Sequence, residues 1–160
     1  MHMFTLHCSA YGDGEAIPLK CVHQSAGGKN ISPGFSWTDP PTATKSFALS
    51  IIDPHPVARN WVHWFVINIP FRDRRLEEGA SMKDLLPMGS RELMNTSGEM
   101  GYGGPAPPKG SGAHPYVATL YALNVDMLNI GKNLTLREFQ RGIDGKVIEE
   151  ARMTGKYERK

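Results

Sequence analysis

The sequence lacks long apolar runs, and it lacks a marked excess of either charge. It contains no stretch of roughly 18 consecutive apolar residues, the length that a transmembrane helix needs. A total of 18 lysines and arginines against 16 aspartates and glutamates gives a net charge of +2. This balance excludes a broad electrostatic footprint for nucleic acid or for an anionic membrane. The first residues also lack the basic and apolar regions of a secretory signal, so we expect a soluble, cytoplasmic protein.

Cysteine is scarce as well. Cys8 and Cys21 are the only cysteines, and they form no CxxC pair. A reducing compartment keeps both as thiols, for which we expect a structural role. The length of 160 residues suffices for one core without disulfides or metals. Because no repeat, charge block or low-complexity linker marks a second domain, the sequence predicts a single domain over residues 1–160.

Long helical segments are also missing. The 17 glycines and 12 prolines divide the chain into short apolar runs, which is typical of an all-β domain. Three runs are rich in β-branched and aromatic residues, namely Ser46–Ile52, Val62–Ile69 and Tyr116–Leu123. We expect these runs to form the central strands of an antiparallel β-sandwich.

Helices are expected only near the C-terminus. Thr135 and Glu138 form a capping box, and Gly142 is a suitable stop for the helix that it begins. Farther on, Val147, Ile148 and Ala151 recur at helical spacing, with Gly155 beyond them. This second pattern predicts another short helix that packs on the sandwich.

Polar side chains stand at the ends of the three apolar runs. Asp53 follows the first run, His63 lies near the start of the second, and His114 and Tyr116 begin the third. Each such group costs free energy if it is buried without a partner, so a strand that only filled a core would not carry it. Polar groups at one end of three strands predict a pocket at the rim of a sheet.

The alternation of side chains along a strand predicts which of these groups share a face. By this alternation, Asp53 lies on the same face as Phe47, Leu49 and Ile51. His63 lies on the same face as Trp61, Phe65 and Ile67. His114 and Tyr116 lie on the same face as Ala118, Leu120 and Ala122. Trp61 and Trp64 then lie on opposite faces. At most one of them lines a pocket, and the other packs in a core.

The segment from Gly101 to Tyr116, "GYGGPAPPKGSGAHPY", resembles a phosphate loop only superficially. A nucleotide P-loop needs a lysine followed by serine or threonine, whereas Lys109 precedes a glycine here. Its prolines also carry no N–H. We expect a rigid loop that either aims a few amides, such as those of Gly104 and Ala106, at an anion or simply connects two strands.

Two kinds of active centre are disfavoured by spacing. The ligands of a zinc site are usually close together in the sequence, whereas Asp53, His55, His63 and His114 are widely separated, so we predict no metal. We place His55 in a proline-flanked turn. A Ser-His-Asp triad would require Asp53 and His63 with Ser97 or Ser111. No GxSxG elbow supports such a triad, although triads are recognised by geometry.

Taken together, "KNISPGFSW", "KSFALSIIDPHP", "NWVHWFVINIP" and "YGGPAPPKGSGAHPYVATLYAL" resemble the phosphatidylethanolamine-binding protein family, in its bacterial and archaeal branch. The resemblance runs from "FTLHCSAYGDGEAIP" to "VIEEARMTGKY". It implies a sandwich of two antiparallel sheets with a small anion pocket for phosphate, acetate or a phospholipid headgroup. The pocket residues that it implies are Asp53, Trp61, His63, Gly104, Ala106, Pro108, His114 and Tyr116.

The resemblance implies no enzyme chemistry and no cofactor. Family members have been linked to inhibition of protein kinases or serine proteases, and prokaryotic members often form dimers, so a homodimer is expected. The chain departs from the family motifs at three places: His55 replaces an acid, Pro56 and Val57 shift a proline, and Pro115 replaces an arginine. These departures rearrange the charge around the pocket while its core residues remain.

We therefore expect a non-catalytic binding protein. Asp53 holds a histidine tautomer, and His63, His114 and Tyr116 donate hydrogen bonds to phosphate oxygens, with affinity that falls as the pH rises through about 6.5. The alternative is a phosphoester hydrolase that uses the same acid, histidines and tyrosine as general acid and base. The physiological ligand and protein partner are not written in the sequence.

Overall fold

The computed structural model describes residues 3–131 and 135–160, and its strands form two antiparallel sheets. The small sheet has the order β1 (Thr5–Cys8), β2 (Phe35–Thr38) and β5 (Arg75–Leu76). The large sheet has the order β6 (Arg91–Glu92), β4 (Trp61–Pro70), β3 (Ser46–Asp53), β7 (His114–Leu123) and β8 (Val147–Tyr157). The three predicted strands are β3, β4 and β7, which are interior in the large sheet. The predicted all-β sandwich is thus confirmed.

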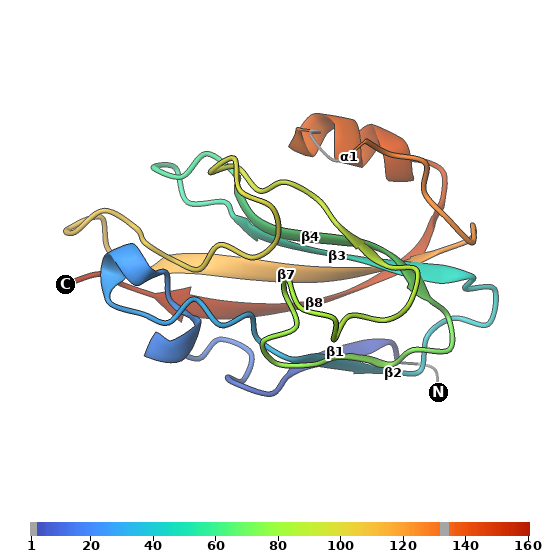
Figure 1. Ribbon diagram of the computed structural model, residues 1–160, viewed down its shortest axis with the longest axis horizontal. Helices are drawn as coiled ribbons and strands as arrows, with labels where there is room; N and C mark the ends of the chain where they lie inside the picture. Colours follow the sequence, from blue (N-terminus) through green and yellow to red (C-terminus); the bar gives the residue numbers. More distant parts are fainter. Residues whose placement is uncertain (1–2, 132–134) are drawn as a thin grey trace.

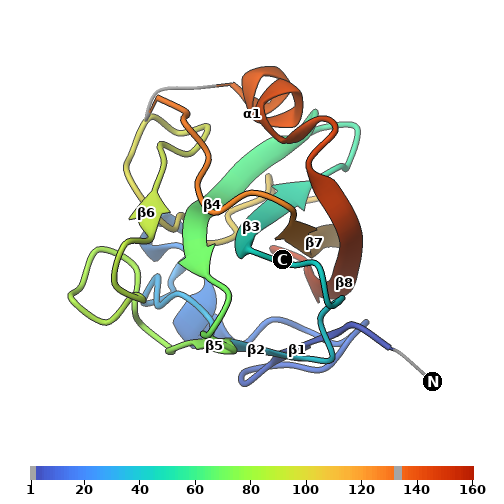
Figure 2. The same ribbon diagram turned by 90° about the vertical axis from the view of Figure 1, so that its right-hand side faces the viewer.

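The molecule has three layers. Helix α1 (Leu136–Ile143) covers one face of the large sheet, and the small sheet covers the other face (Figures 1 and 2). One apolar cluster fills the space between the sheets, and a second lies under α1, where Phe65 stacks on Phe139 with ring centroids 4.4 Å apart. Within the described ranges, no helix is both long and apolar enough to cross a membrane.

Helix α1 begins as the capping box predicts but ends differently. The Thr135 hydroxyl accepts the backbone N–H of Glu138, which confirms the predicted start. The stop is not Gly142, since the residue in the left-handed region is Gly145, at φ 75°. Gly142 instead allows close packing, because a Cβ there would lie 2.7 Å from Cδ1 of Ile130.

The predicted second helix is wrong, because residues 147–157 form strand β8. The strand pairs with β7 along its length, with Ala118 opposite Met153 and Leu120 opposite Ala151. Ala151 and Met153 are buried in the core between the sheets, two residues apart as a strand requires. Gly155 is no helix stop, since a Cβ there would lie 2.5 Å from the ring of Tyr11.

Both cysteines are free thiols, as expected. Cys21 is buried in the core, ends the short 3-10 helix η1 (Leu19–Cys21), and has its pKa raised to about 12 by burial and by neighbouring Cys8. A thiol with a raised pKa holds little of the reactive thiolate at neutral pH. The structural role predicted for Cys21 is consistent with this position.

A β-bulge changes the predicted faces of β4. Ile51 pairs with Trp64 and Ile52 pairs with Val62, so His63 is an extra residue that breaks the alternation. Residues opposite each other share a face, and Asp53 lies opposite Trp61. The prediction that Trp61 and Trp64 lie on opposite faces is therefore wrong.

Because of the same bulge, the four residues predicted to share one face, His63 among them, lie on two different faces of the sheet. Phe65 and Ile67 pack in the outer cluster under α1, whereas Trp64 packs in the core between the sheets. The ring of His63 meets that of Tyr116 edge to face, with centroids 5.0 Å apart. The bulge thus turns Trp61 and His63 toward Asp53 and Tyr116, on the inner face of the sheet.

Candidate functional site

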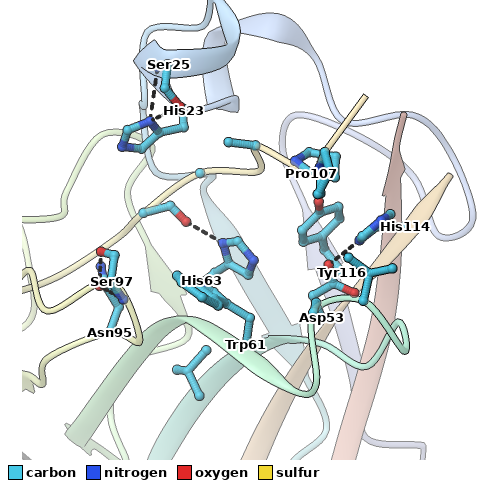
Figure 3. Close-up of a pocket in the computed structure, with 17 residues that line it drawn as sticks. His23, Ser25, Asp53, Trp61, His63, Asn95, Ser97, Pro107, His114 and Tyr116 are labelled. Atoms are coloured by element: carbon cyan, nitrogen blue, oxygen red, sulfur yellow. Dashed lines mark hydrogen bonds and ion pairs between the residues drawn. The ribbon is translucent and has the colours of Figure 1, made fainter. Parts of the chain in front are cut away.

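A pocket of about 360 Å³ lies at the end of the sandwich where the C-terminus and the long loops gather (Figures 1 and 3). The last residue of β3, the first residues of β4 and β7, and loop 103–108 form its walls. All eight residues expected from the resemblance line it, namely Asp53, Trp61, His63, Gly104, Ala106, Pro108, His114 and Tyr116. That these residues bind a ligand stays a prediction.

Asp53 and His114 form a buried pair at the base of the pocket. The Nδ1–H of His114 donates to Oδ2 of Asp53 over 2.6 Å, and the two side chains are 0% and 3% exposed. The other oxygen, Oδ1, accepts the backbone N–H of His55 over 2.9 Å. Both carboxylate oxygens therefore have partners within the protein, and the predicted role of Asp53 in fixing a histidine tautomer agrees with this geometry.

The ring of His114 is engaged at both nitrogens. Its Nε2 lies 2.9 Å from the hydroxyl of Ser111, which itself lies 2.6 Å from the carbonyl of Pro108. With Nδ1–H given to Asp53, Nε2 of the neutral ring is an acceptor, so Nε2 and the carbonyl of Pro108 both lie within reach of the single hydrogen of the Ser111 hydroxyl. Both ring nitrogens of His114 thus have partners within the protein, and the expectation that His114 donates to a bound phosphate stays a prediction.

His55 has a specific position that the turn assignment missed. Its ring stacks on that of His114, with centroids 3.7 Å apart and planes 5° apart. Its Nδ1 accepts the backbone N–H of Val57, which closes the turn after β3. His55 thus covers the outer side of the Asp53–His114 pair and does not line the pocket.

His63 is one of three histidines that line the cavity, beside His23 and His114. Its Nδ1 lies 2.7 Å from the carbonyl of Gly103, and since a carbonyl only accepts, Nδ1 carries a hydrogen. In Figure 3 the second ring nitrogen points toward Tyr116 and Asp53. Burial lowers the pKa of His63, although the carbonyl of Gly103 and the charge of Asp53 oppose the effect. In the neutral ring, Nε2 is therefore a hydrogen-bond acceptor aimed into the pocket.

Tyr116 supplies a hydroxyl that has no hydrogen-bond partner among the described residues. The side chain is only 2% exposed, and Figure 3 shows its hydroxyl directed toward the loop above the pocket. Burial, and after it the negative charge of Asp53, raises the pKa of Tyr116. The hydroxyl therefore keeps its hydrogen at neutral pH and can donate it to an anion.

Loop 103–108 offers fewer amides than the sequence suggested. The N–H of Gly104 donates to Oδ1 of Asn30 over 2.6 Å, so this amide already has a partner within the protein, and its contact with an anion stays a prediction. The N–H of Gly103 donates to the carbonyl of His63. Because three of the six residues are prolines, the amide of Ala106 is the loop donor that has no partner among the described residues.

The N-terminal segment holds this loop in place. Tyr102 donates its hydroxyl to the carbonyl of Cys21 over 2.6 Å, and the backbone N–H of His23 donates to the carbonyl of Pro105. A Cβ on Gly104 would lie 2.4 Å from the oxygen of Cys21, so this close approach requires glycine. The loop is thereby fixed before any ligand binds, which lowers the ordering cost of binding.

Nine further residues line the pocket that the predicted set of ligand-binding residues did not include: His23, Ser25, Val57, Ala58, Val62, Asn95, Ser97, Gly103 and Pro107. Gly103 and Pro107 adjoin predicted residues, and proximity in the chain was a usable signal for them. No local pattern marked His23, and Ser97 was considered only as a member of a triad, because both reach the pocket from distant loops. Ser97 donates its hydroxyl to Asn95.

The alternative centres can now be compared with the geometry. In the described part of the chain, no three histidine, cysteine or acidic side chains lie close enough to hold a metal ion. Asp53 pairs with His114 and not with His63, so the triad considered from sequence is wrong in its histidine. Ser111, His114 and Asp53 do form a continuous series of hydrogen bonds, and this series bears on the hydrolase alternative.

Comparisons with known proteins cover almost the whole chain. The sequence matches the phosphatidylethanolamine-binding protein family over residues 8–158. A UPF0098 protein of Methanothermobacter thermautotrophicus is 37% identical over 154 residues, which make up 96% of this chain and 98% of that relative. The crystal structure of Escherichia coli YbcL, described as a new member of the mammalian PEBP family, has a TM-score of 0.92 at 31% identity and covers 98% of this chain and 99% of that one.

Another relative, LppC of Mycobacterium tuberculosis, is named as a lipoprotein and is 32% identical over 96% of this chain and 72% of its own length. Because relatives of this kind occur, the cytoplasmic location of the chain stays a prediction. The fold, the family match and the aligned lengths all agree. The chain belongs to the phosphatidylethanolamine-binding protein family.

Proposed function

We propose that the chain is a binding protein whose pocket takes the phosphate group of a small molecule or headgroup. The observation that carries this proposal is a set of hydrogen-bond donors without partners, close to the carboxylate of Asp53, whose two oxygens already accept hydrogen bonds from the protein. Tyr116 and Ala106 have donors without partners among the described residues, and both line the pocket. Asp53 accepts two hydrogen bonds from the protein, so its charge is offset locally and repels an anion less.

The shape of the pocket favours a phosphate that carries a substituent. Its volume of about 360 Å³ lies near the lower end of the range for small-molecule sites, about 300–1,000 Å³. Apolar groups of Val57, Ala58, Trp61 and Pro107 line it beside the polar groups. Trp61 is 39% exposed and stands at the rim. The phosphate therefore binds at the polar base, and the substituent lies against the apolar wall.

Calorimetry with inorganic phosphate tests this proposal. Replacing Tyr116 by phenylalanine removes one donor to a charged ligand and is expected to weaken binding roughly tenfold or more. The matched control is Tyr121→Phe, on the same strand, whose hydroxyl contacts Ser50 outside the pocket. Equal loss of affinity in both variants, or none in either, would count against the proposed site.

The hydrolase alternative is favoured by one observation, the series Ser111–His114–Asp53, which has the order of hydrogen bonds found in serine hydrolases. Two details weigh against it. The carbonyl of Pro108 competes with His114 for the hydrogen of the Ser111 hydroxyl, and the side chain of His114 is fully buried. We therefore favour binding without turnover.

An activity assay separates the two functions. The purified protein is incubated with aryl phosphates and phospholipid esters, with and without zinc or magnesium, beside the variants His63→Ala and Ser111→Ala. Binding without turnover is the expected result. Turnover that disappears in either variant would replace the binding proposal by the hydrolase.

Protein partners and assembly remain separate predictions. The resemblance suggests regulation of a protein kinase or a serine protease, and relatives suggest a homodimer. Light scattering on the purified chain measures the assembly directly, with twice the monomer mass of 17.7 kDa as the result expected for a dimer. Inhibition assays against kinases and serine proteases test the regulatory role.

A further inference from the structure

A second hollow, of about 360 Å³, lies at the other end of the sandwich from the pocket described above. Pro70, the last residue of β4, lines this hollow, whereas Trp61, the first residue of the same strand, lines the pocket. Strand β4 runs along the length of the molecule, so the two sites lie at opposite ends of the sheet (Figure 1). No described residue lines both of them.

Asn68 is the buried polar residue of this hollow. It is only 6% exposed, and its Oδ1 accepts the backbone N–H of Leu128 over 2.8 Å. Since an N–H can only donate, this bond fixes which side-chain atom is the oxygen and which is the nitrogen. Nδ2 has no partner among the described residues, and it is not sealed from solvent. Asn68 therefore presents a fixed N–H donor at the hollow.

A β-bulge gives Asn68 an unusual backbone. Between the pairs Phe47–Ile69 and Leu49–Val66, β4 has one residue more than β3. Asn68 lies in this bulge and takes the left-handed region, at φ 59°, which asparagine tolerates better than most residues. Strained backbone of this kind concentrates at binding and catalytic sites. The conformation of Asn68 thus agrees with a role beyond pairing within the sheet.

Three charged side chains line the same hollow, namely Lys45, Arg72 and Asp126. All three are exposed, and none forms an ion pair with another described residue. Because Ser46 pairs with Pro70, Lys45 and Arg72 leave the sheet at the same corner. Two cations and one acid give a local charge of +1, which is complementary to a monoanion.

The hollow also has an apolar part. Phe71 and Met127 line it and are 39% and 68% exposed, although both are large apolar side chains. Met127 directly precedes Leu128, so the bond between Leu128 and Asn68 holds Met127 next to the polar donor. An anion that carries an apolar substituent can bury that substituent against these two side chains.

We propose that this hollow is a second binding site, which takes a small organic monocarboxylate. Asn68 donates Nδ2–H to a carboxylate oxygen, and Lys45 and Arg72 offset the charge, for which the planar fork of arginine is well suited. A dianionic phosphate fits less well, because Asp126 repels the second negative charge. The proposal is independent of phosphate binding at the other end of the sandwich.

An NMR titration with hexanoate at neutral pH tests the proposal, since a carboxyl group with a pKa of about 4 is then ionised. We expect saturable shifts at millimolar hexanoate in the side-chain amide of Asn68 and the backbone amide of Met127. Hexanol lacks the charge and acetate lacks the chain, so each is expected to bind roughly tenfold more weakly. Unmoved Asn68 resonances, shifts confined to Ala106 and His63, or equal affinity for hexanol would overturn the proposal.

Variants of the exposed charges test the electrostatic part without touching the core. Arg72→Gln is expected to weaken hexanoate binding roughly fivefold, and Asp126→Asn is expected to strengthen it about two- to fivefold. The matched control is Arg152→Gln, which changes an exposed arginine of β8 that does not line the hollow. An unchanged affinity in Arg72→Gln, or an equal loss in Arg152→Gln, would overturn the proposed role of Arg72.

Asn68→Asp tests the buried donor. Aspartate keeps an oxygen for the N–H of Leu128 and tolerates the left-handed region, but it replaces the N–H donor by a second oxygen. Hexanoate binding is expected to fall roughly tenfold or more, while amide NMR spectra establish that the variant is folded. Affinity equal to that of the wild type would overturn the role of Asn68. If this variant does not fold, Arg72→Gln decides the proposal.

The two sites are distinguished by Tyr116→Phe, which changes only the phosphate pocket. Hexanoate shifts at Asn68 are expected to be the same in this variant as in the wild type. If they disappear, the carboxylate binds in the phosphate pocket, and the second site is rejected.

Discussion

Both carboxylate oxygens of Asp53 accept hydrogen bonds from the protein. These bonds offset the negative charge of Asp53 and explain how a carboxylate can lie in a pocket that is proposed to bind an anion. The sequence placed Asp53, His63 and Tyr116 in one pocket correctly, because motifs at strand ends were sufficient. It could not assign the role of His114, since that role depends on Ser111 and on complete burial, which are tertiary facts. His23 was missed because no pattern connects its loop with the pocket.

The buried pair gives a prediction for stability. In Asp53→Asn a single carbonyl oxygen must serve two donors, the ring of His114 and the backbone of His55, so one of them loses its acceptor. Breaking a buried pair costs about 3–5 kcal/mol, and we expect urea denaturation to show a loss of about 3 kcal/mol.

The control for that variant is Glu77→Gln, which breaks the exposed pair of Arg75 and Glu77 at 2.9 Å. A surface pair contributes below about 1 kcal/mol. If both variants lose the same small amount, the Asp53–His114 pair is not the internal support described above.

His63 gives a prediction for the pH dependence of folding. Its pKa is lowered in the folded protein by burial, whereas in the unfolded chain it is about 6.5. The unfolded state therefore binds more protons below about pH 6.5, and the folded state loses stability as the pH falls through this range. His63→Gln removes this contribution, so the stability advantage of the wild type over the variant should shrink between pH 7.5 and 5.5. An advantage that does not change with pH would contradict burial of the neutral ring.

At the scale of elements, the strands with strong apolar patterns were predictable, and the departures have local causes. In residues 147–157 the spacing of Val147, Ile148 and Ala151 is compatible with a helix, whereas the spacing of Ala151 and Met153 is that of a strand. The segment forms a strand because it pairs with β7. The bulge at His63 left no mark in the sequence that alternation could detect. An inserted residue reverses every face assignment beyond it.

The loop above the pocket gives a prediction at this scale. Gly104→Ala places a Cβ within 2.7 Å of the backbone nitrogen of His23 and forces the loop away from the N-terminal segment. Overpacking of this kind costs about 1–3 kcal/mol, and phosphate affinity should fall with it, because Ala106 moves with the loop.

Thermal denaturation and calorimetry measure both effects. Gly131→Ala is the control, because no atom of the described residues lies within 4 Å of a Cβ at that position. If Gly104→Ala keeps both stability and affinity, the loop is not fixed by this contact.

At the scale of the whole molecule, the sandwich was predictable because apolar alternation and Gly and Pro punctuation agreed with the family resemblance. The layers follow from which strand faces are apolar: α1 covers the outer cluster, and the small sheet covers the inner one (Figure 2). The pocket lies where the inner layer ends and loops from distant parts of the chain meet. Sequence patterns predict the layers better than the loops, because loops are positioned by contacts such as that of Asn30 with Gly104.

The most direct test of the account is an NMR titration of the uniformly labelled protein with inorganic phosphate at neutral pH. The account predicts saturable shifts at the amide of Ala106 and the ring of His63, with smaller changes at the ring of His114, whose nitrogens keep their partners. These shifts should require millimolar or lower phosphate and should be strongly reduced in Tyr116→Phe. Resonances of Ala106 and His63 that stay unmoved, or shifts confined to surface lysines and arginines, would contradict the central claim that this pocket binds phosphate.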